Sequence, residues 1–192
     1  MKQDLTLKKQ EVTVLLIIFD LDKTSIYCPI ADFMDRFIPQ NKTLKQLYYK
    51  IYPFIHTLEM KFGLCKINEK MYGRVKSLVN QVATTDDDIT ADIYFMVLTA
   101  RHETFQTYKH VDLIFKEYAN DIDVCCVAHG ITGLSKAEYL DRHYNIADHV
   151  EIIMYDDNYK ELVEMKKKYG SRFTGFKVMM DKNGNEVYVN KC

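Results

Sequence analysis

The most constraining stretch of this chain is residues 14–24, where an unbroken apolar run leads directly into two carboxylates. The apolar run, residues 14–19, is followed by Asp20, Leu21, Asp22, Lys23 and Thr24. A short run of this kind, rich in β-branched side chains, is typical of a strand buried on both faces. Such a strand leaves a carboxylate no place except its end. We therefore expect Asp20 and Asp22 at the carboxyl edge of a sheet, where open α/β sheets bind ligands.

The spacing of the two acids adds a second expectation. Asp20 and Asp22 are two positions apart, so they share a face if the extended backbone continues past the strand. Two carboxylates held close together repel each other unless a cation or a proton lies between them. The pair therefore predicts a divalent metal ion, a shared proton, or both.

Strands and helices alternate along most of the chain. Apolar runs predict strands at residues 14–19, 93–98, 123–127, 150–155 and 176–180, with a returning hairpin strand at 186–189. Helical spacing marks residues 30–38, 44–62, 71–82, 105–118, 136–144 and 159–169. This order predicts an α/β fold with a Rossmann-like parallel sheet covered by helices on both faces and a C-terminal β-hairpin. The core domain would comprise residues 1–29 and 84–192, and residues 30–83 would form a helical insertion.

Several local signals set the expected ends of these elements. Gly63 is a plausible helix stop, Asn68 is a candidate cap for the next helix, and Ser135 with Glu138 forms a capping box. Pro53 is expected to kink the long helix or to divide it. We expect residues 1–11 to be a solvated lead-in, residues 39–41, 129–133 and 181–185 to be turns or loops, and residues 84–92 to be an acidic loop.

An aromatic stripe, Tyr48, Tyr49, Tyr52 and Phe54, lies within the predicted insertion. Two uses of such a stripe are open, a platform for stacking nucleic-acid bases and an ordinary helical core. Core packing is the commoner use of this spacing, and we expect it here.

Composition narrows the class of protein. The chain has 192 residues, 47% of them hydrophobic and 28% charged, which suits a folded domain with a sizeable core. The net charge of −1 gives no global basic field for nucleic acid. No apolar run is long enough to span a membrane, and no secretory segment precedes the first strand. We expect a cytoplasmic protein that does not bind membranes. Its five cysteines, with no C-x-x-C pair, are expected to be free thiols and not a structural zinc site.

Polar groups follow the other predicted strands in the same way. Thr99 and Arg101 follow the second strand, Asp156 and Asp157 follow the fourth, and Lys136 opens a helix. In a parallel sheet these ends meet at one edge, so we expect the groups to converge there. Several carboxylates with one or two cations suit Mg²⁺ and an anionic ligand, because Mg²⁺ prefers carboxylate, water and phosphate oxygens.

This order of motifs resembles the haloacid dehalogenase (HAD) superfamily of phosphatases. Four stretches carry the resemblance: Asp20-Leu21-Asp22-Lys23-Thr24, Thr99, Lys136 and Asp156-Asp157. They match the family's Asp-x-Asp-x-Thr motif, its strand-end Ser or Thr, its helix-opening Lys and its acidic pair. The insertion stands where the family places its first type of cap. One departure is Lys23, where the family commonly has Gly.

The resemblance implies a role for each matched residue. Asp20 would attack phosphorus and form an aspartyl-phosphate, while Asp22 would protonate the leaving alcohol and then activate water. Thr99 would hydrogen-bond the transferring phosphoryl group, and Lys136 would offset its charge. Mg²⁺ would be bound by Asp20, by the carbonyl of Asp22 and by the acidic pair. Either both Asp156 and Asp157 or only one of the two would be a direct ligand. Thr24 and Lys23 join Arg101 as candidates for substrate binding.

The function expected from this resemblance is a Mg²⁺-dependent phosphomonoesterase. An acid at position 22 favours phosphoryl transfer to water, with a small phosphorylated metabolite or a nucleotide as substrate. Two alternatives stay open. Thr99-Ala100-Arg101 followed by a long helix also resembles the phosphatase half of polynucleotide kinase-phosphatases, a nucleic-acid 3′-phosphatase, and the fold can also serve a non-catalytic phospholigand-binding protein. Arg101 would either contact the substrate phosphate or pair with an acid at the sheet edge.

Overall fold

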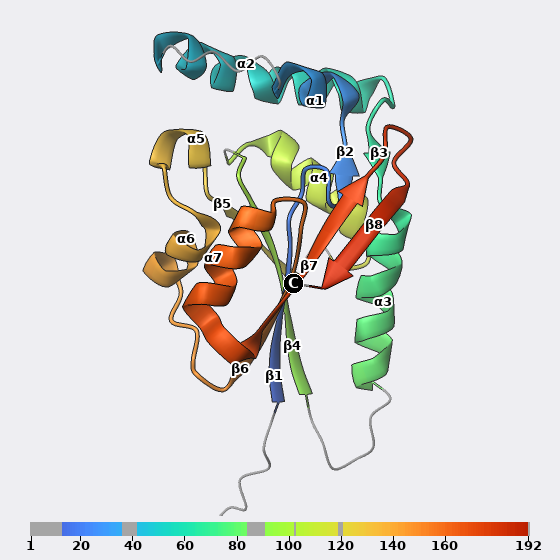
Figure 1. The fold of residues 1–192 in the computed structure, drawn as a ribbon. Helices are drawn as coiled ribbons and strands as arrows, with labels where there is room; N and C mark the ends of the chain where they lie inside the picture. Colours follow the sequence, from blue (N-terminus) through green and yellow to red (C-terminus); the bar gives the residue numbers. More distant parts are fainter. Residues whose placement is uncertain (1–12, 36–41, 84–90, 102, 119–120, 192) are drawn as a thin grey trace, which may run out of the picture.

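A six-stranded sheet forms the centre of the molecule (Figure 1). The computed structural model describes residues 13–35, 42–83, 91–101, 103–118 and 121–191. The expected lead-in at 1–11, the turn at 39–41 and most of the acidic loop at 84–92 lie outside these residues. The strands of the sheet are β1 (Thr13–Phe19), β4 (Ala91–Thr99), β5 (Ile122–Cys126), β6 (Val150–Asp156), β7 (Phe173–Met180) and β8 (Glu186–Lys191).

The strands are arranged in the order β5-β4-β1-β6-β7-β8. All neighbours are parallel except β7 and β8, which form the C-terminal antiparallel hairpin. Numbered along the chain, the order is 3-2-1-4-5-6, which is compatible with a Rossmann-like fold. The order reverses between β1 and β6, and a ligand site is expected outside the carboxyl ends of these two strands. The predicted α/β class and mostly parallel sheet are confirmed.

Strand β1 is buried on both faces, as its sequence predicts. Ile17 and Phe19 pack in one hydrophobic cluster and Leu16 and Ile18 in another, because alternate side chains point to opposite faces. The helices α3 (Glu69–Ala83) and α4 (Phe105–Phe115) contribute to the first cluster. The helices α6 (Lys136–His143) and α7 (Tyr159–Tyr169) contribute to the second.

The segment expected to be a helical insertion contains three helices in two different environments. Figure 1 shows α1 (Pro29–Asp35) and α2 (Lys42–Lys61) above the carboxyl ends of the strands, whereas α3 runs alongside the sheet. Met71 and Val75 of α3 are fully buried in the same cluster as Ile17 and Phe19. Helix α3 is therefore part of the layer that covers the sheet. A separate cap domain over residues 30–83 stays a prediction, for which α1 and α2 are the candidates.

Three details differ from the sequence-based expectations. Helix α2 is a single helix, so Pro53 does not divide it, and a kink at Pro53 stays a prediction. The expected loop at 129–133 contains a one-turn helix, α5 (His129–Thr132). A small antiparallel sheet was not predicted: it pairs β2 (Ile26–Tyr27) with β3 (Lys66–Ile67). Its strands are too short for alternation of apolar and polar residues to reveal them.

The predicted helix boundaries have the expected hydrogen bonds. After α2, the amide of Gly63 donates to the carbonyl of Met60 and the amide of Leu64 donates to that of Glu59, with Gly63 at φ 64°. This is a Schellman motif. The Asn68 side chain accepts from the amide of Met71 at the start of α3, at 3.1 Å. The capping box of Ser135 and Glu138 is also present.

The aromatic stripe of α2 is divided between interior and surface. Tyr48 is buried and Tyr52 packs against the core, whereas Phe54 is 63% exposed. The side chain of Tyr49 lies outside the described residues. Core packing therefore holds for Tyr48 and Tyr52. None of the described helices combines the length and apolarity that crossing a membrane requires.

The tip of the β7–β8 hairpin is fixed to the rest of the fold. Arg74 of α3 makes a bidentate ion pair with Glu186, whose carboxylate also accepts from the Asn68 side-chain amide at 3.2 Å. In the turn, the Asp181 carboxylate accepts from the amides of Asn183 and Asn185 at 2.8 and 2.9 Å. The turn chemistry expected for residues 181–185 is confirmed.

Close packing at this turn gives a stability prediction. Gly184 has φ 82°, and an alanine Cβ there would lie 2.3 Å from the Cβ of Lys66. We expect Gly184→Ala to lower the free energy of unfolding by about 2–4 kcal/mol, from left-handed strain and overpacking together. Gly133 has φ 69° but no atom within 4 Å of the added Cβ. Gly133→Ala should therefore cost only about 1–2 kcal/mol. Urea unfolding of both variants checks this, and equal losses would contradict it.

Candidate active site

Polar side chains meet where adjacent strands of the sheet end. Asp20 follows β1, Thr99 ends β4 and Asp156 ends β6, and all three are buried. Ladder pairing brings these ends together, because the Asp20 amide still donates to the Tyr155 carbonyl of β6 at 2.8 Å. The convergence predicted from the parallel topology is therefore present in the structure.

Lys136 connects two of these acids. Its Nζ lies 2.5 Å from Asp20 Oδ1 and 2.6 Å from Asp156 Oδ2, and its side chain is almost fully buried. Helix α6 positions it: Lys136 is the first residue after the Ser135 cap, and its amide donates to Glu161 of α7 at 2.9 Å. A buried ammonium with two carboxylate partners is held in one place, because leaving either charge without a partner would be costly.

Asp20, Asp156 and Asp157 form an acidic group whose oxygens lie within 4.8 Å of one another. Burial, followed by the Asp156 carboxylate, raises the pKa of Asp157 to about 7. Burial also raises the pKa of Asp20; Lys136 lowers it, and the neighbouring carboxylates raise it further. Three carboxyl groups thus lie together with one ammonium, which pairs with two of them. These carboxylates fit a hard divalent cation such as Mg²⁺, which prefers oxygen ligands.

Asp20 and Asp22 do not share a face. Strand β1 ends at Phe19, and Lys23 adopts the left-handed region at φ 60° within a tight turn that returns the chain to Ile26. The extended backbone on which a common face depended therefore stops before Asp22. As a result, the Asp20 side chain contacts Lys136, and the Asp22 side chain contacts Arg101.

Arg101 makes a bidentate ion pair with Asp22. Its Nε donates to Asp22 Oδ2 at 2.7 Å, and Nη2 donates to Oδ1. Arg101 therefore pairs with an acid at the sheet edge, which was one of its two expected uses. Despite burial, this guanidinium holds the pKa of Asp22 well below its usual range. In the structure as it stands, Asp22 is thus ionised and lacks the proton that a general acid requires.

The remaining candidates lie beside these pairs. The Thr99 hydroxyl accepts from the Arg101 amide at 3.3 Å. Thr24 is fully buried, and its hydroxyl has no hydrogen-bond partner among the described residues. Lys23 is partly exposed, and its Nζ lies 2.8 Å from Asp32 of α1. Lys23 therefore joins the Asp20–Thr24 loop to the helices above the sheet edge.

A second polar cluster, buried except at the partly buried Cys65, adjoins Arg101 and was not predicted. Its members are Cys28, His56, Glu59, Cys65 and His110. Arg101 Nη1 contacts His110 Nδ1, so the two clusters adjoin. These residues are spread over 83 positions, from 28 to 110, and only His56 and Glu59, three positions apart on α2, have a spacing typical of metal ligands on a helix. No signal in the sequence brings them together.

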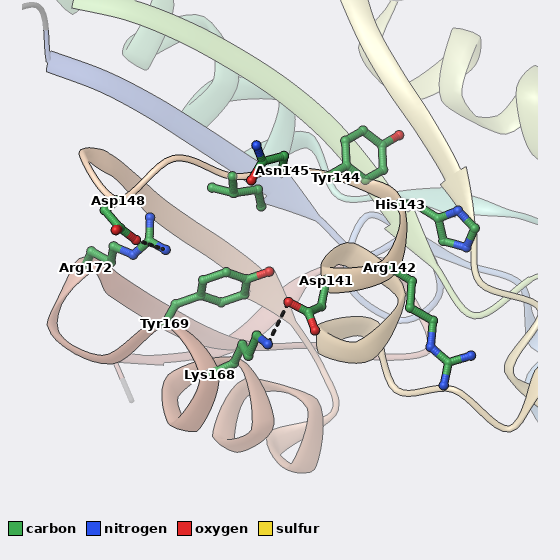
Figure 2. Close-up of a pocket in the computed structure, with 10 residues that line it drawn as sticks. Asp141, Arg142, His143, Tyr144, Asn145, Asp148, Lys168, Tyr169 and Arg172 are labelled. Carbon is green, nitrogen blue, oxygen red and sulfur yellow. Dashed lines mark ion pairs between the residues drawn. The ribbon is translucent and has the colours of Figure 1, made fainter.

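A concave region lies apart from the acidic group and is lined by none of its residues. It has a volume of about 500 Å³ and lies between α6, α7 and the loop before β6 (Figure 2). Lys168 pairs with Asp141 at 2.6 Å and Arg172 with Asp148 at 3.4 Å, all with partly or fully exposed side chains. Exposed pairs of this kind contribute little energy. The region contains none of the predicted site residues.

A scan against protein-family models, a search of curated proteins and a search of solved structures found no match to this chain.

Proposed function

We propose that this protein is a HAD-type, Mg²⁺-dependent phosphomonoesterase that acts through an aspartyl-phosphate on Asp20. One observation carries the proposal: Lys136 bridges Asp20 and Asp156 at the end of β1, where the strand order reverses. The four sequence motifs of the resemblance stand in the expected order around this point. A purely structural ion pair would not account for a third carboxylate, Asp157, in the same group.

In the proposed reaction, Asp20 attacks the phosphorus atom of a phosphate ester. The P–O bond to the alcohol breaks, and the phosphoryl group stays on the Asp20 carboxylate as an acyl phosphate. Water then attacks the same phosphorus, releases inorganic phosphate and restores the carboxylate. The Lys136 ammonium, one hydrogen bond away from Asp20, stabilises negative charge on the phosphoryl oxygens. The Thr99 hydroxyl is the matching donor from β4.

Mg²⁺ would be held by Asp20, Asp156 and Asp157, with the Asp22 carbonyl as a further oxygen ligand. When bound, the ion neutralises phosphoryl charge that would otherwise repel the carboxylates. Burial and the Asp156 carboxylate raise the pKa of Asp157 to about 7, and a cation bound beside it would lower that pKa.

Asp22 and Arg101 need a rearrangement in this proposal. The ion pair keeps Asp22 ionised, whereas protonation of the leaving alcohol needs the carboxylic acid. A substrate phosphate offers Arg101 a second bidentate partner. Transfer of the guanidinium from Asp22 to the phosphate would let the pKa of Asp22 rise at the moment when its proton is needed. Arg101 would then pair with Asp22 before the substrate binds and contact the substrate phosphate afterwards, within one catalytic cycle.

The role of Asp22 predicts a dependence on the leaving group. We expect Asp22→Asn to lower kcat/KM for an alkyl phosphate by about 10²-fold or more, because the alkoxide needs a proton to depart. The loss for p-nitrophenyl phosphate should be much smaller, since that phenolate leaves without help. Steady-state kinetics on both esters check this, and an equal loss on both would contradict the acid role.

The first test of the proposed activity uses the unaltered protein. Wild-type protein should hydrolyse p-nitrophenyl phosphate in Mg²⁺ and lose that activity when the ion is chelated. A panel of phosphorylated metabolites and nucleotides is then compared with a 3′-phosphorylated oligonucleotide. We expect the small substrates to be preferred, because the chain has a net charge of −1. Preference for the oligonucleotide, with activity that falls steeply with salt, would favour the nucleic-acid alternative. Absence of hydrolysis throughout the panel would contradict the proposal that this protein is a phosphatase.

A further inference from the structure

The unpredicted cluster is built around two cysteines that the β2–β3 pairing brings face to face. In this antiparallel ladder Ile26 pairs with Ile67 and Tyr27 with Lys66. One step further, the same register places Cys28 opposite Cys65. The Schellman turn after α2 reverses the chain into β3 and so delivers Cys65 to this position. Two cysteines far apart in sequence thus become cross-strand neighbours.

Two groups of candidate metal-ligand atoms share Cys28. Cys28, Cys65 and His110 have ligand atoms within 4.8 Å of one another, and so do Cys28, His56 and Glu59. The residues come from separate elements: Cys28 precedes α1, His56 and Glu59 lie on α2, and His110 lies on α4. Neither group contains Cys65 together with His56 or Glu59, so a site that joins the two groups needs Cys65 and the α2 side chains to move toward a shared centre.

The imidazole of His56 lacks a hydrogen-bond partner. Its side chain is 2% exposed, yet neither ring nitrogen has a partner among the described residues. A buried polar nitrogen without a partner is costly, and native structures rarely keep one without a bound ion or water. His110 is fully buried, and its Nε2 also lacks a partner. His56 lies near one thiol, that of Cys28, and His110 lies near two, those of Cys28 and Cys65, so each group combines an unpartnered nitrogen with a thiol.

The contact of His110 with Arg101 decides which role His110 plays. A guanidinium only donates hydrogen bonds, so Nδ1 of His110 is the acceptor and the proton of the neutral ring is on Nε2. Nε2 of His110 therefore carries a proton, so it is available to donate to a thiolate but not to bind a metal. Glu59 is compatible with the fourth position: its two oxygens accept from the amides of Ile30 and Ala31 and still keep lone pairs.

We propose that Cys28, Cys65, His56 and Glu59 bind Zn²⁺ or a similar thiophilic divalent cation, with His110 donating to the thiolates. Thiolate and imidazole ligands select zinc over magnesium. The ion, two thiolates and one carboxylate sum to one negative charge, which lies beside the Arg101 guanidinium. Cys65 is partly buried and lines a pocket with the tip of the β7–β8 hairpin. Such an ion would join α2 and the β2–β3 sheet, independently of the proposed phosphatase activity.

Cobalt substitution tests the site directly. The full chain is purified, freed of metal with a chelator under reducing conditions, and titrated with Co²⁺ alone. We expect about one equivalent to produce a thiolate-to-cobalt charge-transfer band in the near ultraviolet, which Zn²⁺ then abolishes. The acidic group at Asp20 contains no thiol and cannot give this band. Asp20→Asn should therefore keep the band, which separates this proposal from the proposed activity.

Variants identify the ligands. Cys28→Ser, Cys65→Ser and His56→Gln should lose the band, whereas Cys126→Ser, a free cysteine on β5, should keep it. His110→Gln should weaken Co²⁺ binding about 10–100-fold, as expected for a partner of the ligands. Thermal unfolding of the wild type needs no variant: added Zn²⁺ should raise Tm. A wild type without the band or the rise in Tm, a Cys28–Cys65 disulfide in its place, or loss of the band in Cys126→Ser would overturn the proposal.

Discussion

Asp20→Asn is expected to lower kcat for p-nitrophenyl phosphate hydrolysis by about 10⁴-fold or more, because it removes the proposed nucleophile. The amide is nearly isosteric with the carboxylate but cannot attack phosphorus. Asp156 keeps its contact with Lys136 at 2.6 Å, so the ammonium stays paired and the fold should persist. Steady-state kinetics in Mg²⁺, together with a far-ultraviolet circular dichroism spectrum, check both parts.

The matched control for this variant is Asp112→Asn, an exposed acid on α4. It makes the same chemical change away from the sheet edge and should leave kcat within about twofold, as is usual for a surface substitution. A folded Asp20→Asn protein with near wild-type activity would remove Asp20 from the mechanism. Equal losses in both variants would point to a general effect of charge.

Lys136→Met is expected to lower both activity and stability. The loss of a preorganised cation at the phosphoryl group should reduce kcat by about 10²–10³-fold. It also leaves Asp20 and Asp156 buried without their shared partner, which should cost about 3–5 kcal/mol of unfolding free energy in the absence of Mg²⁺. Mg²⁺ should recover part of that stability, because it binds the same carboxylates in the folded state only.

Kinetics and urea unfolding with and without Mg²⁺ measure these effects of Lys136→Met. Lys168→Met is the control, because Lys168 pairs with Asp141 at 2.6 Å but both side chains are about half exposed. That pair should contribute less than about 1 kcal/mol. If Lys136→Met is no less stable than Lys168→Met, the contacts of Lys136 with Asp20 and Asp156 do not stabilise the folded protein.

The sequence was most informative where one local signal decides the structure. A continuous apolar run made β1 recognisable as a strand buried on both faces, and the parallel topology then implied that Asp20, Thr99 and Asp156 meet at one edge. The sequence signals for helix α7 and for the capping box at Ser135 were equally local. Each depends on residues within a few positions of one another, so periodicity and capping rules suffice to predict them.

The sequence was least informative where distant segments decide the structure. The divergence of Asp20 and Asp22 depends on a turn with Lys23 in the left-handed region, which its residue type does not reveal. The ion pair of Arg101 with Asp22 spans 79 positions, and Cys28 meets Cys65 through strands of only two residues each. The packing of α3 on the sheet was hidden as well, because an amphipathic pattern shows that a face is buried but not against what.

The most direct measurement is to trap the phosphorylated enzyme. Wild-type protein is mixed with a phosphate ester and Mg²⁺, quenched in acid within the first turnover, digested and examined by mass spectrometry. We predict a hydroxylamine-sensitive phosphoryl group on the peptide that contains Asp20, and its absence in Asp20→Asn. Turnover of the ester without a phosphoryl group on Asp20, or with one on a different residue, would contradict the proposed mechanism.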